Sequence, residues 1–217
     1  MDLALFDLDE TLISEDSTSL WLRWLVSEGF APPSLLDEER VLMEHYYQGC
    51  LSMEAYMRTT LAPLAGLATR TVEGWIGRFI QRDILPRVYP QARERLEWHR
   101  QRGDLILVIS ASGEHLVNPI AAALGADVAL AVGVSIVDER YSGGIFGTIT
   151  YQQGKLTRLA EWQAEQPHRF DKIWAYSDSM NDAPMLQHAD FARVINPAPP
   201  LHALAEQHGW EVHRWVR

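Results

Sequence analysis

Short apolar runs alternate with longer amphipathic stretches over most of the chain. Leu3–Phe6, Leu105–Ile109 and Lys172–Tyr176 are each followed by polar residues, the pattern of a buried strand that ends in a loop. Between them, Gln91–Arg102 and Glu114–Leu124 have the apolar spacing of helices. Strands that alternate with helices predict an α/β fold with a doubly wound, mostly parallel, Rossmann-like sheet and helices on both faces.

Residues 14–86 have a different pattern, with apolar positions at helical spacing and little strand signal. The predicted helices are a first one whose apolar face runs from Trp21 to Val26, then Leu35–Tyr47 with Ser34 as its N-cap, Ser52–Leu61 and Thr71–Ile84. We therefore expect an all-helical cap domain, 14–86, inserted into an α/β core domain formed by residues 1–13 and 87–217.

The second half of the chain supplies the remaining core elements. Val134–Val137 and Ile145–Tyr151 flank Tyr141–Gly144, which predicts a hairpin that turns at the two glycines. The other predicted strands and helices are Val128–Val132, Lys155–Glu165, Phe191–Ile195, Leu201–His208 and Glu211–Trp215. Near the end, Trp210 and Trp215 are interpreted either as core residues or as contacts of a homodimer.

Composition narrows the function classes. The 217 residues carry a formal net charge of −10, which argues against a nucleic-acid or anionic-membrane partner. The longest apolar region, Leu116–Val137, is interrupted by Pro119 and Gly125, so no membrane span is expected, and the first residues lack a signal-peptide pattern. Cys50 is the single cysteine, which excludes an internal disulfide and predicts a reducing, cytoplasmic location.

Two groups of acidic residues follow predicted strands. Asp7 and Asp9 come directly after the first strand, and Asp178, Asn181 and Asp182 follow the strand that ends at Tyr176. The carboxyl ends of parallel strands meet at one edge of a sheet, so these groups are expected to converge. Clustered carboxylates need a cation, and Asp and Asn oxygens suit a hard divalent ion. A capped turn is the alternative for each group, and for Asp7 and Asp9 taken alone it is the more common explanation.

A hydroxyl and a lysine complete the pattern. Ser110 follows the apolar run Leu105–Ile109 just before a predicted helix, where a hydroxyl and free N–H groups favour an anion. Lys155 follows Gly154 at another predicted helix start, against the helix dipole, and a bound phosphate would explain that placement. Simple N-capping and a solvated lysine are the alternatives for the two residues separately.

The ordered combination of acid pair, hydroxyl, lysine and acid pair resembles the haloacid dehalogenase superfamily, in its phosphoserine-phosphatase-like branch. The matching motifs are Phe-Asp7-Leu-Asp9-Glu-Thr11, Val-Ile-Ser110, Gly-Lys155 and Ser-Asp178-Ser-Met-Asn181-Asp182. The helical insertion between the first two motifs is similar to that branch's cap. Ser177 departs from the family, which usually has Gly there, and Ser110-Ala111-Ser112 stands where phosphoserine phosphatases typically carry Ser-Gly-Gly.

The resemblance implies a phosphoric monoester hydrolase. Asp7 is the expected nucleophile that forms an aspartyl-phosphate, and Asp9 the expected general acid and base. Ser110 and Lys155 are expected to hold the phosphoryl oxygens and to stabilise their charge in the transition state.

The resemblance also implies Mg²⁺ as the cofactor. Its expected protein ligands are the Asp7 carboxylate, the backbone carbonyl of Asp9 and the Asp178 carboxylate. Asp182 and Asn181 are expected to orient these ligands.

The substrate implied is a small phosphorylated metabolite, such as phosphoserine, histidinol phosphate or another amino phosphate ester. Asp16 occupies the family's acidic position for the substrate amine, and Arg58 lies in a segment similar to the one that carries a carboxylate-binding arginine. A solvent-facing arginine is an equal alternative for Arg58. The expected substrate-binding residues are Asp16, Arg58, Ser110, Ala111, Lys155 and Asn181.

Three rival functions remain at this point. A phospho-acceptor signalling domain, or a phosphotransferase without rapid hydrolytic turnover, also uses an acid cluster, a hydroxyl and a lysine. A dehalogenase of the same superfamily needs neither a metal nor a second carboxylate, so Asp9 and Asp178 argue against it. A non-catalytic binding protein would not need the full set of motifs.

Overall fold

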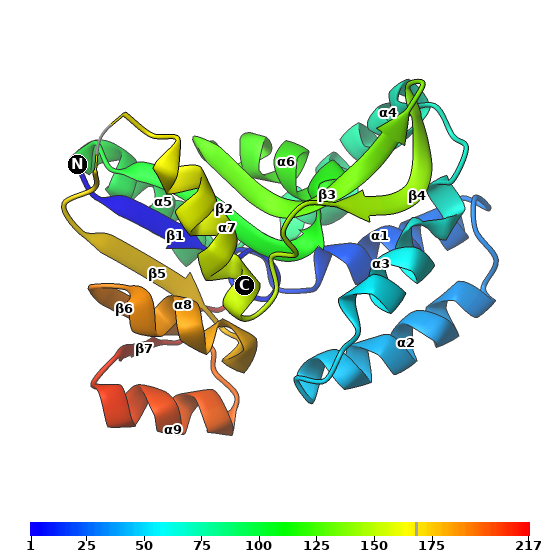
Figure 1. Ribbon diagram of the computed structural model, residues 1–217. Helices are drawn as coiled ribbons and strands as arrows, with labels where there is room; N and C mark the ends of the chain where they lie inside the picture. The colour runs from blue at the N-terminus through cyan, green and yellow to red at the C-terminus, as the bar shows by residue number, and fades with distance from the viewer. Residues whose placement is uncertain (168) are drawn as a thin grey trace.

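The strands form one seven-stranded sheet in the order β4-β3-β2-β1-β5-β6-β7 (Figure 1). The structure, a computed structural model, describes residues 1–167 and 169–217. Neighbouring strands are parallel except β3 and β4, which confirms the predicted α/β fold. The strands are β1 (Leu3–Phe6), β2 (Leu105–Gly113), β3 (Val128–Val137), β4 (Arg140–Phe146), β5 (Ile173–Ser177), β6 (Phe191–Ile195) and β7 (Glu211–His213).

The sheet is covered by helices on both faces because its central strands are apolar at successive positions. In β1, Ala4 and Phe6 belong to one hydrophobic cluster, whereas Leu3 and Leu5 belong to the other, as the two-residue period of a strand requires. The first cluster is completed by α5 (Pro90–Arg102) and α6 (Glu114–Ala123), and the second by α7 (Gln153–Ala164), α8 (Ala183–His188) and α9 (Pro199–His208).

Residues 14–86 contribute none of the seven strands. Aromatic packing holds this helical part together, since the Trp21 ring lies 5.2 Å from the rings of both Trp24 and Phe79. In Figure 1 the helices α1 to α3 stand beyond the carboxyl end of β1. The elements are α1 (Ser17–Ser27), α2 (Ser34–Tyr47), α3 (Met53–Leu61), α4 (Thr69–Phe79), 3₁₀ turns at Ala62–Leu64 and Leu85–Arg87, and a π-helical turn at Ile80–Ile84.

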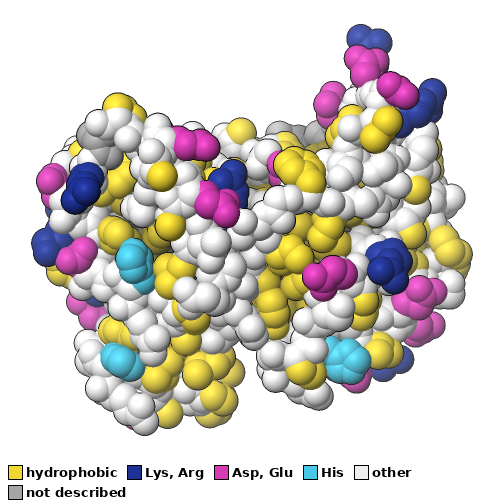
Figure 2. All heavy atoms as spheres, in the orientation of Figure 1, with side chains coloured by type: hydrophobic (Ala, Val, Ile, Leu, Met, Phe, Trp, Pro, Cys, Tyr) yellow, Lys and Arg dark blue, Asp and Glu magenta, His cyan; other side chains and the backbone are white. Residues whose placement is uncertain are grey.

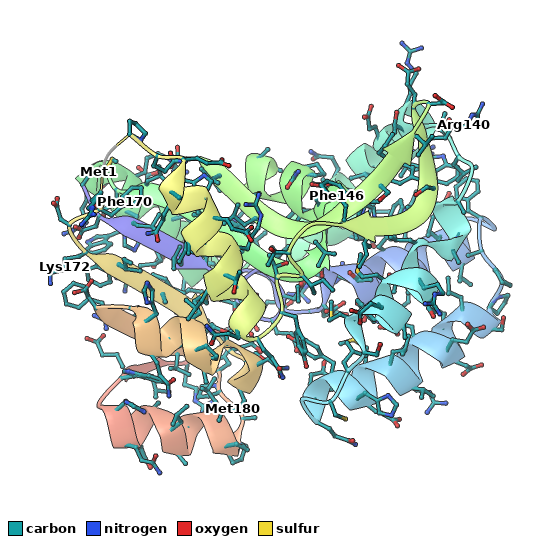
Figure 3. The ribbon with its side chains drawn as sticks, viewed as in Figure 1. Met1, Arg140, Phe146, Phe170, Lys172 and Met180 are labelled. Carbon is teal, nitrogen blue, oxygen red and sulfur yellow. The ribbon has the colours of Figure 1, made fainter. Side chains whose placement is uncertain are left out.

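The hairpin turns at a different place from the one predicted. β3 and β4 are joined by Asp138 and Glu139, whose φ angles of 49° and 59° match the positive values that two-residue hairpin turns favour. Tyr141–Gly144, predicted as the turn, lies inside β4, and Figure 3 shows Arg140 at the tip of the hairpin. The prediction failed because Asp-Glu lacks the glycine that usually marks such a turn. The segment 147–151, predicted as strand, follows the end of β4.

Two smaller predictions are also corrected. α2 begins at Ser34 itself with Pro33 as its N-cap, so Ser34 does not cap the helix. β2 continues to Gly113, which pairs with Val132, and Ser110 therefore lies within a strand rather than at a helix start. The apolar run ends at residue 109, but backbone pairing continues because it does not depend on side-chain polarity.

The two C-terminal tryptophans pack inside the molecule. Trp215 is buried in the first hydrophobic cluster, and Trp210 packs against the second. The homodimer stays a prediction. In the part of the chain that the structure describes, no helix has the length and apolar character needed to cross a bilayer.

A pair of glycine substitutions tests the packing at the start of α7. A Cβ at Gly154 would lie 1.9 Å from the backbone oxygen of Ile149, so Gly154→Ala is expected to lower the free energy of unfolding by about 1–3 kcal/mol. A Cβ at Gly74 in α4 meets nothing within 4 Å, so Gly74→Ala is expected to raise it by about 0.5–1 kcal/mol. Urea unfolding measures both, and equal effects of the two variants would contradict this assignment.

Candidate active site

Two acids that are far apart in the sequence converge on one hydroxyl. Asp7 follows β1 and Asp178 follows β5, which is its neighbour in the sheet. Thr11 Oγ1 lies 3.2 Å from Asp7 Oδ2 and 2.8 Å from Asp178 Oδ1, and it accepts a hydrogen bond from the Asp178 backbone N–H at 3.0 Å. The ends of these strands therefore bring together the two carboxylates among the predicted metal ligands.

Asp9 is held from two sides. Its Oδ1 accepts a 2.6 Å hydrogen bond from the backbone N–H of Ser17, the first residue of α1. Its Oδ2 accepts hydrogen bonds from the hydroxyls of Ser110 and Ser112, each at 3.0 Å. The carboxylate thereby lies between the first helix of residues 14–86 and the end of β2, at the positive end of the α1 dipole.

Lys155 is buried between two carboxylates. Its Nζ donates to Asp7 Oδ1 and to Asp182 Oδ2, both at 2.7 Å. Burial opposes the ammonium charge, but the charges of Asp182 and Asp7 outweigh it and raise the pKa of Lys155. The ammonium group is therefore charged at neutral pH and fixed beside the predicted nucleophile.

Ser177, where the family usually has Gly, has a clear place in this network. It is the last residue of β5, where its backbone does not need the positive φ that glycine would supply. Its buried hydroxyl donates to Asp182 Oδ2 at 2.7 Å and accepts from the backbone N–H of Ser179 at 3.1 Å. The serine therefore supports the carboxylate that binds Lys155.

The acids hold more negative charge than Lys155 neutralises. Burial raises the pKa of Asp7 to about 7, even though the Lys155 ammonium acts in the opposite direction. Burial and the charge of Asp7 also raise the pKa of Asp178 well above its usual value. A further cation near these two carboxylates would relieve this repulsion.

The oxygen atoms suit a magnesium ion. Lys155 contacts Asp7 Oδ1, whereas Asp7 Oδ2 and Asp178 Oδ1 both face Thr11. Hard oxygen donors of this kind are what Mg²⁺ prefers. Within residues 1–167 and 169–217, no three His, Cys, Asp or Glu side chains are arranged to hold a metal, so the predicted set depends on the Asp9 carbonyl and solvent.

A small cavity of about 20 Å³ adjoins Asp7 and Asp9. Its lining includes Asp7, Asp9, Asp16 and Ala111, so the predicted substrate-binding residues Asp16 and Ala111 do lie at the site. Asp16 is also the N-cap of α1, where its Oδ1 accepts a 2.7 Å hydrogen bond from the Ser19 backbone N–H. The rest of the lining comes mainly from the helical part, at Met43, Tyr46, Leu51, Met53, Tyr56 and Ser112.

Asn181 joins the two parts of the molecule. Its Nδ2 donates to the backbone oxygen of Tyr46 at 3.1 Å, and its Oδ1 accepts from Gln152 Nε2 at 3.1 Å. Gln152 Nε2 also donates to the backbone oxygen of Gly49 at 3.2 Å. These contacts border a recess of about 350 Å³ between the end of α2 and the start of α9, and Figure 2 shows the surface indented there.

Arg58 lies apart from this group. Its side chain is exposed on α3, and it lines neither the small cavity nor a cleft of about 410 Å³ that also borders Asp16. Its assignment as a substrate-binding residue stays a prediction.

Sequence reasoning missed several residues of the site. Thr11 was part of a recognised motif, but no role was expected for it, although it links Asp7 to Asp178. Ser112 contacts Asp9, and its position two residues after Ser110 was a signal that could have been used. Gln152 has an unusual φ of 50°, which no sequence pattern indicated.

Residues 4–187 match the model of the haloacid dehalogenase-like hydrolase family. The chain belongs to this family. It is 33% identical over 218 residues to a histidinol-phosphatase of Neisseria meningitidis serogroup C (strain 8013), and the match covers 97% of each chain. The prediction of a phosphatase of this superfamily is thereby confirmed.

Two solved structures show the same architecture. A protein of unknown function from Bordetella pertussis Tohama I is 33% identical, with a TM-score of 0.89 and 97% coverage of each chain. A phosphoserine phosphatase captured as a phospho-aspartyl intermediate analogue is 22% identical, with a TM-score of 0.69 and coverage of 97% of this chain and 91% of that one. At 22% identity, the similarity to the phosphoserine phosphatase structure supports the fold alone.

Removal of the buried ammonium tests the electrostatics of the site. Lys155→Met is expected to lower the free energy of unfolding by about 3–5 kcal/mol at neutral pH, because Asp7 and Asp182 are left buried without the cation that neutralises them. A carboxyl with a raised folded-state pKa binds protons more tightly when folded, so this deficit is largest above pH 7 and shrinks as the pH falls toward 5.

The matched control is Lys172→Met, which removes an exposed ammonium 2.8 Å from Asp190. It is expected to change stability little at any pH, because water screens the pair. Thermal unfolding of both variants between pH 5 and 8 provides the measurement. A deficit in Lys155→Met that grows as the pH falls would overturn the electrostatic account.

Proposed function

We propose that the protein hydrolyses small phosphomonoesters through a phosphorylated Asp7, with Mg²⁺ as the required ion. One arrangement carries this proposal. Asp7 presents one oxygen to Lys155, while its other oxygen and an oxygen of Asp178 face the same threonine hydroxyl. The proposed nucleophile thus has an ammonium beside one oxygen, and beside the other it has carboxylate and hydroxyl oxygens of the kind that bind a hard cation.

In the first half-reaction the Asp7 carboxylate attacks phosphorus and the bond from phosphorus to the leaving oxygen breaks. Asp9 gives its proton to that oxygen. In the second half-reaction Asp9 takes a proton from a water molecule that attacks the aspartyl-phosphate, which releases phosphate and restores Asp7. The hydrogen bonds from Ser17, Ser110 and Ser112 fix the Asp9 carboxylate for both transfers.

The approach of a phosphate dianion to a carboxylate requires neutralisation. Lys155 supplies one positive charge. The Ser110 hydroxyl donates to Asp9 here, and it would supply a neutral donor to the phosphoryl group after rotation away from Asp9. Asp7, Asp178 and the Asp9 carbonyl would hold Mg²⁺, which when bound lowers the charge on the phosphoryl oxygens. Asp182 keeps Lys155 in place through its 2.7 Å contact.

The substrate class we propose is an amino phosphate ester. Asp16 lines the small cavity beside Asp7, where a carboxylate suits a substrate amine. The Neisseria relative is named a histidinol-phosphatase, and histidinol phosphate and phosphoserine both carry an amine. Ala111, Asn181 and Lys155 complete the proposed substrate contacts.

A dehalogenase or a phospho-acceptor signalling domain is the alternative. Asp9 points to hydrolysis, because its carboxylate lines the same small cavity as Asp7. A dehalogenase would have no use for the second carboxylate, and a signalling domain would retain its phosphoryl group. Multiple turnover of p-nitrophenyl phosphate separates the proposed function from both.

Replacement of the nucleophile is the direct test. Asp7→Asn is expected to lower turnover of p-nitrophenyl phosphate by on the order of 10⁴-fold or more, because the amide cannot form the intermediate. The fold should persist, since Lys155 keeps its contact with Asp182. Asp37→Asn, at an exposed carboxylate on α2, serves as the control and should retain full activity. Near-normal turnover by Asp7→Asn would refute the assignment.

Metal removal tests the cofactor. Dialysis against EDTA is expected to abolish hydrolysis, and added Mg²⁺ is expected to restore it, because the buried acids otherwise repel the phosphate. Asp178→Asn should raise the Mg²⁺ concentration needed for half-maximal activity by about tenfold or more. Activity that persists in EDTA would exclude the metal-dependent mechanism.

A further inference from the structure

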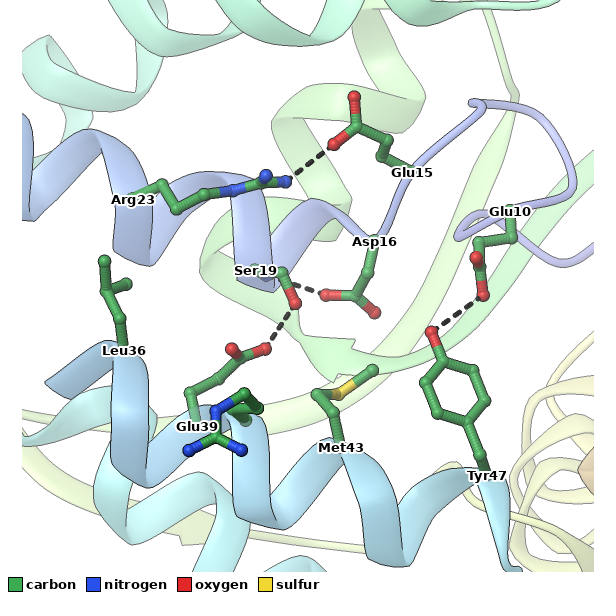
Figure 4. A pocket seen from close by; sticks show the side chains of 10 residues that line it. Glu10, Glu15, Asp16, Ser19, Arg23, Leu36, Glu39, Met43 and Tyr47 are labelled. Carbon is green, nitrogen blue, oxygen red and sulfur yellow. Dashed lines mark hydrogen bonds and ion pairs between the residues drawn. The ribbon is translucent and has the colours of Figure 1, made fainter.

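A larger cleft opens beside the catalytic cavity (Figure 4). Its volume is about 410 Å³, and it shares two lining residues, Asp16 and Met43, with the small cavity that contains Asp7. The organic group of a substrate whose phosphate lies at Asp7 would therefore be directed past Asp16 toward this cleft. The side chains in the cleft decide which organic groups can follow the phosphate.

Two carboxylates in the cleft share one neutral partner. Asp16 accepts a hydrogen bond from the backbone N–H of Ser19 at 2.7 Å. Glu39, on α2, accepts a hydrogen bond from the hydroxyl of the same serine. The Glu39 residue is only 8% exposed. Among residues 1–167 and 169–217, no lysine, arginine or histidine forms an ion pair with either carboxylate.

The cations that line the cleft are engaged elsewhere. Arg23 donates to Glu15 at 2.6 Å, and Arg87, from outside the cleft, donates to the other oxygen of Glu15 at 2.7 Å. Arg40 lies 3.5 Å from Glu44 and is largely exposed. Glu15 is thus neutralised twice, whereas Asp16 and Glu39 are not neutralised.

The position of this carboxylate pair favours one kind of ligand. Desolvation, with repulsion from Asp9 and Glu39, raises the pKa of Asp16, so the apo protein bears an electrostatic cost that a bound cation would relieve. A substrate carboxylate would instead face two like charges, and Arg58, the predicted carboxylate receptor, lines neither cavity.

We propose that Glu39 is a specificity-determining residue that acts with Asp16 to select phosphomonoesters whose organic group is cationic and carries no carboxylate. This inference rests on the phosphatase function proposed above. It adds a second carboxylate to the substrate-binding residues and excludes amino-acid phosphates such as phosphoserine as preferred substrates.

Three substrates that differ at a single group test the inference with the unmodified, Mg²⁺-loaded protein. 2-Aminoethyl phosphate carries the amine, 2-hydroxyethyl phosphate replaces it by a neutral hydroxyl, and phosphoserine adds a carboxylate to the first compound. The expected kcat/KM for the aminoethyl compound is about tenfold or more above each of the others, since a charged partner is gained or a like charge is avoided.

Substitution of two of the glutamates that line the cleft tests whether Glu39 causes the selectivity. Glu39→Gln retains a carbonyl oxygen for the Ser19 hydroxyl, and it is expected to reduce the aminoethyl-to-hydroxyethyl ratio of kcat/KM by about tenfold, mainly through KM. Glu15→Gln is the matched control, because that carboxylate lines the same cleft but is already paired with two arginines, and the ratio should stay unchanged.

The outcomes separate the two levels of the proposal. Hydrolysis of p-nitrophenyl phosphate together with equal or better use of phosphoserine would overturn the cationic selectivity and leave the phosphatase function standing. An unchanged ratio in Glu39→Gln, or an equal loss in Glu15→Gln, would remove Glu39 from its role. Absence of hydrolysis for every phosphomonoester would overturn both proposals.

Discussion

The ammonium group of Lys155, buried between Asp7 and Asp182, is the interaction on which the rest of the site depends. The three residues come from α7, from the end of β1 and from the turn before α8, so one cation joins segments that meet only in the folded chain. Without that charge, the carboxylates of Asp7 and Asp182 would repel each other in the protein interior, where water does not screen them. With it, the rise that burial causes in the pKa of Asp7 is opposed at one carboxylate oxygen, and the second oxygen contacts Thr11, as does an oxygen of Asp178.

The opposite side of the site is tied to the helical part of the molecule. Asp9 accepts a hydrogen bond from the first residue of α1, and Asn181 donates to the end of α2. The residues around the proposed phosphate site therefore also contact the helices of residues 14–86. The same two helices position Asp16 and Glu39. Asp16 is the N-cap of α1, Glu39 lies on α2, and both accept hydrogen bonds from Ser19. The helices α1 and α2 thus position both the proposed catalytic residues and the proposed specificity residues.

Patterns in the sequence predicted the regular parts of the structure well. Leu3–Phe6 and Phe191–Ile195 are strands with the predicted bounds. Leu3–Phe6 is a continuous apolar run because this central strand is buried on both faces, whereas Phe191–Ile195 is apolar except at the partly buried Arg193. The position of the hairpin turn at Asp138 and Glu139 was not predicted, because its backbone conformation is imposed by strand pairing and not by a turn-forming residue. The role of Ser177 was also not predicted, since its extended backbone and its contact with Asp182 are visible only in three dimensions.

By itself, the sequence determined the alternation of strands and helices, the position of the helical insertion and the order of the motif residues. These depend on local hydrophobicity and on residue chemistry, which a linear pattern records. Only the tertiary structure decided that Thr11 links Asp7 with Asp178, that Arg58 stands away from the cavities and that Glu39 joins Asp16. Such contacts depend on how helices pack against the sheet edge, and packing brings together residues whose spacing along the chain carries no signal.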